Sequence, residues 1–245
     1  MWAVAVALFD LGRTLVRGDP AVLFARFLRA RGRFADGAWQ DLEEAVRAYH
    51  ADGGTDAAVD RANAAFAGAF AGLRPEDVAA WAAEMVAEPG EIGYYAYTKP
   101  LVDAIARLGY RRFAVTGVAE PLAGLIGRAL GLDGTFGTAL ETDTAGRLTG
   151  ATVFDGKPGW KLARVRDLLA AEGDALRESL AFGDSAADLP ILLAVGRPVV
   201  VNARAAFHDD IAARGWPQYG EDDDVAGALP VLLARPSWNE PRLSG

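Results

Sequence analysis

The sequence predicts an α/β fold, a Rossmann-like doubly wound parallel sheet with an inserted helical domain. Short apolar runs rich in β-branched and aromatic residues alternate with longer segments of helical period, which is typical of a parallel sheet flanked by helices. The first two runs are separated by about a hundred residues, too many for one crossover connection, which predicts an insertion. Several runs also end in a polar side chain, as expected where such a sheet binds a ligand.

Four segments have the composition of buried strands: residues 2–9, 112–116, 180–182 and 198–201. Each is short and apolar and is followed by a glycine or a polar residue, the usual end of a strand. A further segment, ALETDTAGRLTGATV, predicts a β-hairpin with Ala145 and Gly146 near its turn.

The insertion has the sequence pattern of helices. The stretches AVLFARFLRARG and AVDRANAAFAGAF place apolar residues at helical spacing. Glycine and proline interrupt the pattern in RGDP at 17–20 and again in the segment 88–100, which leads back to the sheet. We therefore expect a helical cap domain at 19–94 and an α/β core domain at 1–18 and 95–245.

The composition limits the classes of partner and site. The chain has 245 residues, of which 51% are hydrophobic and 24% charged, and its net charge of -8 argues against binding nucleic acid. It has no cysteine, and its two histidines, His50 and His208, are far apart in the sequence, so a metal ion has to be bound through oxygen. The opening MWAVAVALFD lacks a basic leader and a cleavage site, so we expect a strand there, a cytoplasmic protein and no membrane partner. The oligomeric state is left open.

Oxygen-bearing side chains lie where four apolar runs end: Asp10, Thr116, Asp184 and Asn202. Because the carboxyl ends of parallel strands share one edge of the sheet, we expect these side chains to line one cleft. A lysine near the start of the helix-like segment KLARVRDLLAAEG would add a positive charge. Taken singly, each of these residues is more often a turn or cap residue, but their ordered combination predicts a site for a Mg²⁺-bound phosphoryl group.

Four short motifs occur in order along the chain. They are FDLGRTL at 9–15, VTG at 115–117, GKPGWK at 156–161 and GDSAADLP at 183–190, of which the last is the most specific. In these motifs the chain resembles the haloacid dehalogenase superfamily, and within it the phosphoserine-phosphatase-like branch. The resemblance covers most of the chain, and the helical insertion stands where that family has its cap domain.

The resemblance implies a Mg²⁺-dependent phosphoryl transfer from a small phosphorylated metabolite. Asp10 would attack phosphorus and form an aspartyl-phosphate, a role in which an ionised carboxylate needs no base. Mg²⁺ would bind oxygen atoms of Asp10 and Asp184 and the backbone carbonyl of Gly12. Asp188 would be a further ligand or would hold the waters of the metal ion.

Other residues would bind the phosphoryl group. The resemblance implies hydrogen bonds from Thr116 and from the Gly117 amide, and a lysine that neutralises charge in the transition state. That lysine is Lys161 or Lys157, and we favour Lys161 because the segment KLARV matches the family's usual pattern. Arg13 has two interpretations, a contact to phosphate or substrate and an exposed loop arginine.

Gly12 departs from the family pattern, because active phosphatases of the family usually have aspartate there. That carboxylate protonates the leaving group and later activates water, and general acid/base catalysis typically contributes on the order of 10² to 10⁴ in rate. Glycine keeps the backbone carbonyl, so metal binding and phosphoenzyme formation remain expected. A branch of the family with a small residue here cleaves carbon–phosphorus bonds with a cap lysine, but no lysine lies between positions 17 and 97.

Three functions are to be distinguished. We favour a Mg²⁺-dependent phosphatase or phosphotransferase. The alternative is a repurposed or non-catalytic member that binds a phosphate or diphosphate group without ordinary turnover. The third is a serine hydrolase, suggested by GDSAA with Ser185 and His208, but this segment lacks the final glycine of G-x-S-x-G.

Overall fold

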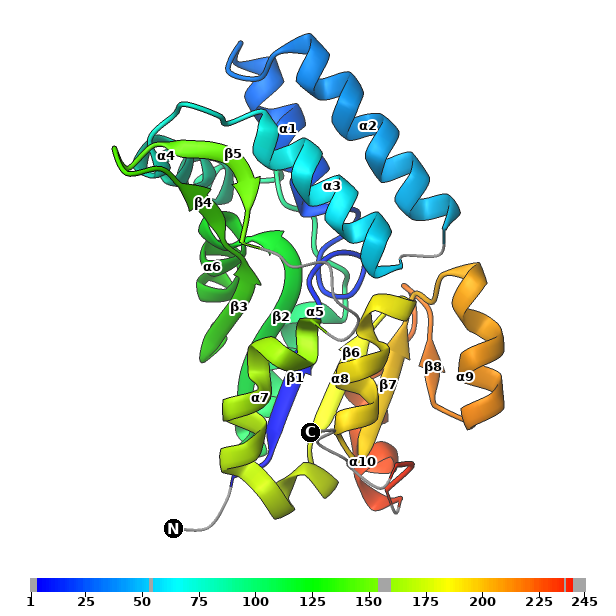
Figure 1. Ribbon diagram of the computed structural model, residues 1–245. Coiled ribbons are helices and arrows are strands. Elements are labelled where there is room, and N and C mark those ends of the chain that lie inside the picture. Colours follow the sequence, from blue (N-terminus) through cyan, green and yellow to red (C-terminus); the bar gives the residue numbers. More distant parts are fainter. Residues whose placement is uncertain (1–3, 53–54, 154–159, 236, 240–245) are drawn as a thin grey trace.

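The centre of the molecule is a six-stranded parallel sheet in the order β3-β2-β1-β6-β7-β8 (Figure 1). The computed structural model describes residues 4–52, 55–153, 160–235 and 237–239. The strand order reverses on either side of β1, as in Rossmann-like sheets, and the predicted α/β class is confirmed. The strands are β1 (Val6–Phe9), β2 (Arg111–Ala119), β3 (Gly134–Thr138), β6 (Leu180–Gly183), β7 (Arg197–Val201) and β8 (Gln218–Tyr219).

The four segments predicted as strands form β1, β2, β6 and β7, the interior of the sheet. β1, β6 and β7 are buried along their whole length, which explains the apolar runs of β1 and β6 and the run PVVV that follows the buried Arg197 in β7. The rings of Phe9 and Phe182 stack between β1 and β6 with their centroids 4.9 Å apart. The sequence pattern does not predict the edge strands, because β3 has the glycine-containing sequence GTFGT and β8 has only two residues.

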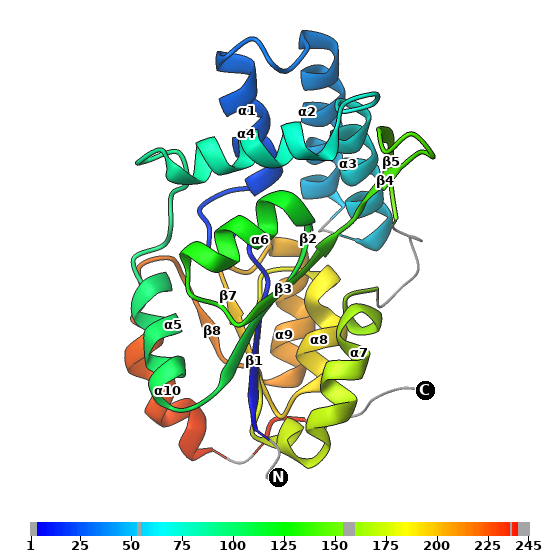
Figure 2. The same ribbon diagram turned by 90° about the vertical axis from the view of Figure 1, so that its left-hand side faces the viewer.

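Helices cover both faces of the sheet (Figure 2). On one face, α5, α6 and α10 share a buried core with Ala7 and Phe9 of β1. On the other face, α7, α8 and α9 share a second core with Val6 and Leu8. Successive residues of β1 thus point to opposite cores, as a doubly wound sheet requires. The helices are α5 (Thr98–Arg107), α6 (Glu120–Ala129), α7 (Trp160–Glu172), α8 (Leu189–Ala194), α9 (His208–Arg214) and α10 (Val225–Ala234).

Four helices follow β1 and lie together beyond the carboxyl ends of the strands (Figures 1 and 2). Asp19 caps the first of them by accepting a hydrogen bond from Ala21 N at 2.9 Å, and Pro20 takes the first helical position. Phe24 belongs to the same buried cluster as Phe9 of β1, so the insertion packs on the core through apolar contacts. The four helices are α1 (Pro20–Ala30), α2 (Asp36–Ala51), α3 (Asp56–Gly68) and α4 (Pro75–Ala87).

The predicted hairpin is present as β4 (Leu140–Thr142) and β5 (Leu148–Thr152), which pair antiparallel. Gly146 lies in its turn with a φ of 74°, in the left-handed region that glycine adopts readily. Two backbone hydrogen bonds attach the hairpin to the loop after α3: Gly72 N donates to Leu148 O at 2.7 Å, and Leu148 N donates to Leu73 O at 2.9 Å.

Short 3₁₀ helices complete the described chain: η1 (Gly173–Arg177), η2 (Ala186–Asp188) and η3 (Ala205–Phe207). Two of them, η2 and η3, follow β6 and β7 directly and lead into α8 and α9. Within the described ranges, no helix combines the length and the apolarity needed to cross a membrane.

Candidate active site

The carboxyl ends of β1, β2 and β6 bring three predicted site residues to one edge of the sheet. β1 pairs in parallel with both β2 and β6, so Asp10, Thr116 and Asp184 are neighbours. β2 continues past Thr116 to Ala119, so the threonine lies within the strand and not at its end. The side chains of Asp10, Thr116 and Asp184 are all buried. The sheet therefore gathers two carboxylates and a hydroxyl in one place.

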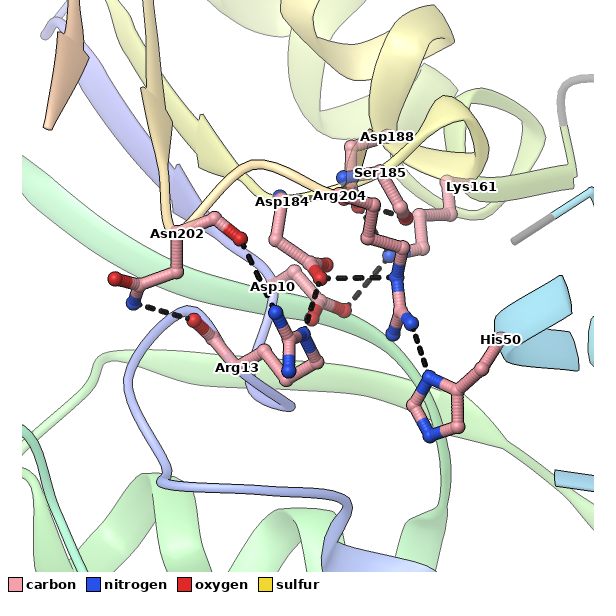
Figure 3. A network of polar contacts seen from close by, with 9 residues as sticks. All are labelled: Asp10, Arg13, His50, Lys161, Asp184, Ser185, Asp188, Asn202 and Arg204. Atoms are coloured by element: carbon pink, nitrogen blue, oxygen red, sulfur yellow. Dashed lines mark hydrogen bonds and ion pairs between the residues drawn. The ribbon is translucent and has the colours of Figure 1, made fainter. Parts of the chain in front are cut away.

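Lys161 lies in the first turn of α7, and its ammonium group sits between two buried carboxylates (Figure 3). Nζ donates to Asp10 Oδ1 at 2.7 Å and also to Asp188 Oδ1. Burial lowers the pKa of Lys161, but the attraction of Asp10 and Asp188 outweighs burial and raises the pKa above its usual value. The ammonium group therefore stays charged. The other candidate lysine, Lys157, lies outside the described residues.

Asp188 holds the turn that follows β6. Its Oδ2 accepts hydrogen bonds from the backbone N–H groups of Asp184 at 3.0 Å and Ser185 at 3.1 Å, and from the Ser185 hydroxyl at 3.2 Å. Ser185 and Asp188 form a capping box at the start of η2. Both oxygens of Asp188 thus have protein donors, which supports a positioning role, and metal binding by Asp188 stays a prediction.

The Ser185 hydroxyl has a carboxylate partner, in contrast to the nucleophile of a serine hydrolase, which hydrogen-bonds an imidazole base. His208, the base suggested for that mechanism, is exposed at the start of α9. These positions give no support to the serine-hydrolase hypothesis.

Asp184 is paired with two arginines. Its Oδ2 accepts a hydrogen bond from Arg13 Nε at 3.1 Å and forms an ion pair with Arg204 Nε, also at 3.1 Å (Figure 3). Burial nevertheless raises the pKa of Asp184 to about 8, although Arg204 lowers it. Burial likewise raises the pKa of Asp10 to about 6, against the lowering effect of Lys161. The surrounding cations therefore do not fully compensate the two carboxylates.

Arg204 is a site residue that the motifs did not indicate. Its backbone N–H donates to Asp184 O at 2.9 Å, and its guanidinium carbon lies 4.4 Å from the centre of the Tyr49 ring on α2. The guanidinium also contacts His50 Nδ1, and burial together with Arg204 lowers the pKa of that histidine. The sequence signal that could have indicated Arg204 is a basic residue shortly after a polar strand end, as in VVVNAR.

Asn202, expected to line the cleft, supports the loop that carries Arg13. Its Nδ2 donates to Arg13 O at 2.8 Å and to Tyr97 Oη at 2.9 Å. Arg13 and Asn202 both have positive φ angles, 58° and 50°, a conformation that a non-glycine residue keeps only when its neighbours hold it. The Arg13 side chain is 36% exposed and its guanidinium lies on Asp184, so Arg13 is not a free loop arginine.

Two glycines let the backbone lie close to the insertion helices. A Cβ added at Gly12 would lie 3.2 Å from Pro20 Cδ, so the start of α1 takes up the space that a side chain needs. A Cβ added at Gly117 would lie 3.2 Å from Val59 Cγ1 of α3. Neither position accepts a side chain without movement of its neighbour.

Many of these residues line one cavity between the sheet edge and the insertion. Asp184 is not among the lining residues, but it contacts Arg13 and Arg204, which are. The core side carries most of the charged and polar groups, and its lining residues are Asp10, Gly12, Arg13, Gly18, Thr116, Gly117, Val118, Trp160, Lys161, Ser185, Ala187 and Arg204. The insertion side is mainly apolar, and it includes Pro20, Leu42, Val46, Tyr49, Val59, Ala62 and Asn63. A ligand in this cavity would have one end among charges and the other against hydrocarbon.

The charged end of the cavity fits a hard divalent cation. The carboxylates of Asp10 and Asp184 and the carbonyl of Gly12 are oxygen donors of the type that Mg²⁺ prefers. Burial raises the pKa of both aspartates more than the neighbouring cations lower it, so a bound cation would favour their ionised forms. In the part of the chain that the structure describes, no three histidine or acidic side chains converge as a metal cluster, so the ion would rely on the carbonyl and on water as well.

The Lys161→Met substitution is expected to lower the free energy of unfolding by about 3–5 kcal/mol, because it leaves Asp10 and Asp188 buried without their shared cation. Urea denaturation in the presence of EDTA measures this loss, since the chelator prevents a metal ion from replacing the ammonium charge. Lys99→Met is the matched control, because Lys99 forms an exposed pair with Asp103 that is worth only about 0.3–0.5 kcal/mol. Equal losses in both variants would contradict the role given to Lys161.

Known proteins share much of this sequence and fold. A putative hydrolase of Mycobacterium leprae is 32% identical over 220 residues, which cover 86% of this chain and 71% of the relative. A phosphoserine phosphatase of Mycobacterium tuberculosis is 31% identical over 220 residues, which cover 86% of this chain and 69% of the relative. A solved structure from Bordetella pertussis Tohama I, of unknown function, is similar with a TM-score of 0.73 and 28% identity, and covers 89% of this chain and 99% of its own.

A phospho-aspartyl intermediate analogue of phosphoserine phosphatase has the same fold, with a TM-score of 0.69 at 19% identity and coverage of 93% of this chain and 98% of its own. The family model described as haloacid dehalogenase-like hydrolase matches residues 7–193, more than half of the 245 residues. The matched range contains Asp10, Thr116, Lys161 and Asp184. By its sequence and its fold, the chain belongs to the haloacid dehalogenase-like hydrolases.

Proposed function

We propose that the chain is a phosphatase or phosphotransferase that acts on a small phosphorylated metabolite through an aspartyl-phosphate at Asp10, with Mg²⁺ as its cofactor. The observation that carries this proposal is the position of Asp10, a buried carboxylate at the end of β1 that lines the cavity while Lys161 Nζ contacts its Oδ1 at 2.7 Å. Relatives named as a probable phosphatase and a phosphoserine phosphatase support the same class of reaction.

Asp10 would act as the nucleophile. Burial raises its pKa to about 6, so the carboxyl group is still mostly ionised at pH 7 and needs no base. A bond forms between a carboxylate oxygen and phosphorus, the bond between phosphorus and the ester oxygen breaks, and the electron pair stays on the leaving oxygen. Lys161 would balance part of the charge that spreads over the phosphoryl oxygens.

Thr116 and Gly117 would hold the phosphoryl group, because both line the cavity beside Asp10 and offer a hydroxyl and a backbone N–H as donors. Arg13, which lines the same cavity and donates to Asp184 Oδ2, would contact the phosphate or the substrate. Each of these contacts orients the phosphorus atom toward the Asp10 carboxylate, which raises the rate through positioning.

Mg²⁺ would be held by Asp10, Asp184 and the Gly12 carbonyl, with Asp188 as a further ligand or as the residue that positions the turn. When bound, the cation would polarise the phosphoryl oxygens and stabilise their charge in the transition state. Arg13 and Arg204, which contact Asp184 in this structure, would share that carboxylate with the metal ion.

We also propose that residues 19–94 act as a cap over a core of residues 1–18 and 95–245. The support for this division is the cavity itself, because residues of α1, α2 and α3 line one side of it. These helices lie beyond the carboxyl ends of the strands (Figure 1). The cytoplasm is the proposed compartment, an expectation that rests on the sequence alone.

Gly12 favours a second candidate function, in which the site binds a phosphate or diphosphate group without ordinary turnover. The carboxylate that usually stands there is missing, and Pro20 Cδ lies 3.2 Å from where a Cβ would be. The start of α1 therefore leaves room at position 12 for glycine, and it would have to move for a larger residue. A site with a nucleophile and no proton-transfer group at this position would form a phosphoenzyme more readily than it hydrolyses one.

A panel of phosphorylated metabolites, with phosphate release measured in Mg²⁺, tests the two candidates together. We expect release from at least one compound at a rate above that of an Asp10→Ala preparation, which measures contamination by other phosphatases. If no compound exceeds this control while calorimetry detects phosphate binding, the chain is a binding protein and not a hydrolase.

Asp184→Asn is expected to weaken Mg²⁺ binding by at least about tenfold, because it removes one of two carboxylates from the proposed donor set. Isothermal titration calorimetry on the metal-free protein measures the affinity without any turnover. Asp103→Asn on the exposed face of α5 is the control and should bind Mg²⁺ like the native protein. An unchanged Mg²⁺ affinity in Asp184→Asn would remove Asp184 from the site.

A further inference from the structure

The insertion helices place a hydrocarbon surface opposite the charged end of the cavity. This surface, which we call the apolar wall, consists of Leu42, Val46, Val59 and Ala62. Leu42 and Val46 are one helical turn apart on α2, and Val59 and Ala62 are one turn apart on α3, so each helix presents one apolar face to the cavity. The wall begins close to the phosphoryl end, because Val59 Cγ1 lies 3.2 Å from where a Cβ on Gly117 would be.

The basic side chains that line the described part of the cavity are already paired with acidic groups. Lys161 contacts two aspartates, and Arg13 and Arg204 both contact Asp184. The lining also includes the acidic Asp19, one oxygen of which caps α1. A substrate carboxylate that entered this cavity would therefore compete with protein carboxylates for every cation within reach and would be repelled by Asp19.

Four arginines of the insertion form ion pairs away from the cavity. Their ion pairs lie outside the described cavity lining and join partly exposed side chains: Arg29–Asp36, Arg31–Glu88, Arg33–Glu84 and Arg61–Asp52. The insertion thus contributes hydrocarbon, the Tyr49 ring, the Asn63 amide and the Asp19 carboxylate to the described lining, whereas these four arginines lie outside it.

These observations indicate the chemical class of the substrate's leaving group. Burial of a carboxylate without a counter-ion is unfavourable, whereas each methylene group that leaves water for an apolar surface gains about three- to fourfold in affinity. We propose that the site selects phosphate monoesters of uncharged, apolar alcohols, aliphatic or aromatic, over esters that carry a carboxylate. The proposal rests on the proposed function, because it concerns the leaving-group end of the same cavity. Phosphoserine, the substrate in the names of several relatives, carries a carboxylate and would be a poor ligand.

Phosphonates test this proposal by binding alone, because their carbon–phosphorus bond replaces the ester bond. Methylphosphonate, butylphosphonate and 4-phosphonobutyrate form a matched series, in which the last carries a carboxylate where butylphosphonate has its terminal methyl group. Calorimetry in Mg²⁺ is expected to find butylphosphonate at least about tenfold tighter than either of the other two.

Substitutions in the apolar wall test whether this surface causes the preference for uncharged ligands. Val46→Ala is expected to weaken the binding of butylphosphonate about threefold or more, because it removes hydrocarbon from the apolar wall. The affinity for methylphosphonate should stay unchanged, because this ligand does not extend to the wall. Val46→Lys adds a cation to the wall. The ratio of the affinities for 4-phosphonobutyrate and butylphosphonate should then shift in favour of 4-phosphonobutyrate by at least about tenfold. Arg47→Ala, at the neighbouring exposed position of α2, is the control and should preserve the native ratio.

The outcomes separate this inference from the proposed function. Equal or tighter binding of 4-phosphonobutyrate by the native protein would overturn the inference and leave a phosphoryl site in place. Failure of all three phosphonates and of inorganic phosphate to bind would overturn the proposed function, and the inference with it. If Val46→Lys does not fold, Val46→Ala still decides, because an unchanged butylphosphonate affinity in that variant would remove Val46 from the ligand's surroundings.

Discussion

Asp10→Asn is expected to abolish phosphoryl transfer, with a loss in kcat on the order of 10⁴- to 10⁶-fold, because a neutral amide is a poor nucleophile and no covalent intermediate can form. The asparagine side-chain oxygen can still accept the hydrogen bond that Lys161 Nζ donates to Asp10 Oδ1 at 2.7 Å, so the fold should persist. Two measurements are needed: phosphate release, and the labelling of the protein by an activated phosphoryl donor.

The controls for this variant separate chemistry from folding. Thermal unfolding of Asp10→Asn should remain cooperative, and Asp103→Asn on α5 should retain full turnover, since Asp103 forms an exposed pair with Lys99 and is not among the described residues that line the cavity. Turnover retained by Asp10→Asn at the native rate, in a preparation free of contaminating phosphatase, would remove Asp10 from the mechanism.

Gly12→Asp is expected to accelerate hydrolysis of the aspartyl-phosphate, because it supplies the carboxylate that protonates the leaving group and activates water elsewhere in the family. In the native protein, dephosphorylation should be slow, so an acyl or aryl phosphate should give a burst of product followed by a slower steady state. Rapid-mixing measurements are expected to show this burst in the native protein and a smaller one in the variant.

The gain from Gly12→Asp should fall short of the range of about 10² to 10⁴ that general acid/base catalysis contributes. A Cβ at this position lies 3.2 Å from Pro20 Cδ, so the start of α1 must move by a few tenths of an ångström. Arg13, the next residue, is also close enough to pair with the new carboxylate. Both effects would displace the carboxylate from its productive position.

Gly12→Asn is the matched control, because asparagine has nearly the same size and meets Pro20 in the same way but transfers no proton. It should hydrolyse the phosphoenzyme no faster than the native protein. If the native protein hydrolyses alkyl phosphates rapidly without a burst, and Gly12→Asp slows it, then another group already transfers the proton and this interpretation of Gly12 is wrong.

The interior of the fold could be predicted because its signals are local. A strand buried on both faces needs an unbroken apolar run, and β1, β6 and β7 each have one. The edge strands β3 and β8 need no such run, since one side of an edge strand has no strand partner, and they escaped prediction. The start of the insertion was indicated by the glycine and proline of RGDP at 17–20, and α1 begins at Pro20.

The gathering of Asp10, Thr116 and Asp184 followed from the same local signals, because parallel strands bring their carboxyl ends to one edge whatever their side chains do. The position of the Asn202 side chain could not be predicted in this way. Asn202 does follow β7, but its φ of 50° turns its amide toward Arg13 O and away from the expected role in the cleft. A backbone angle of this kind depends on the loops that surround the residue.

The sequence by itself determined the interior strands of the sheet, the place of the insertion and the strand-end carboxylates, because each depends on periodicity and on residues close together in the chain. Only the tertiary structure decided which cations meet those carboxylates and what faces them across the cavity. Arg204 reaches Asp184 through a loop after β7, and Val59 reaches Gly117 from a helix of the insertion. Such contacts join distant segments, and their geometry depends on how whole helices and loops pack, which no local pattern encodes.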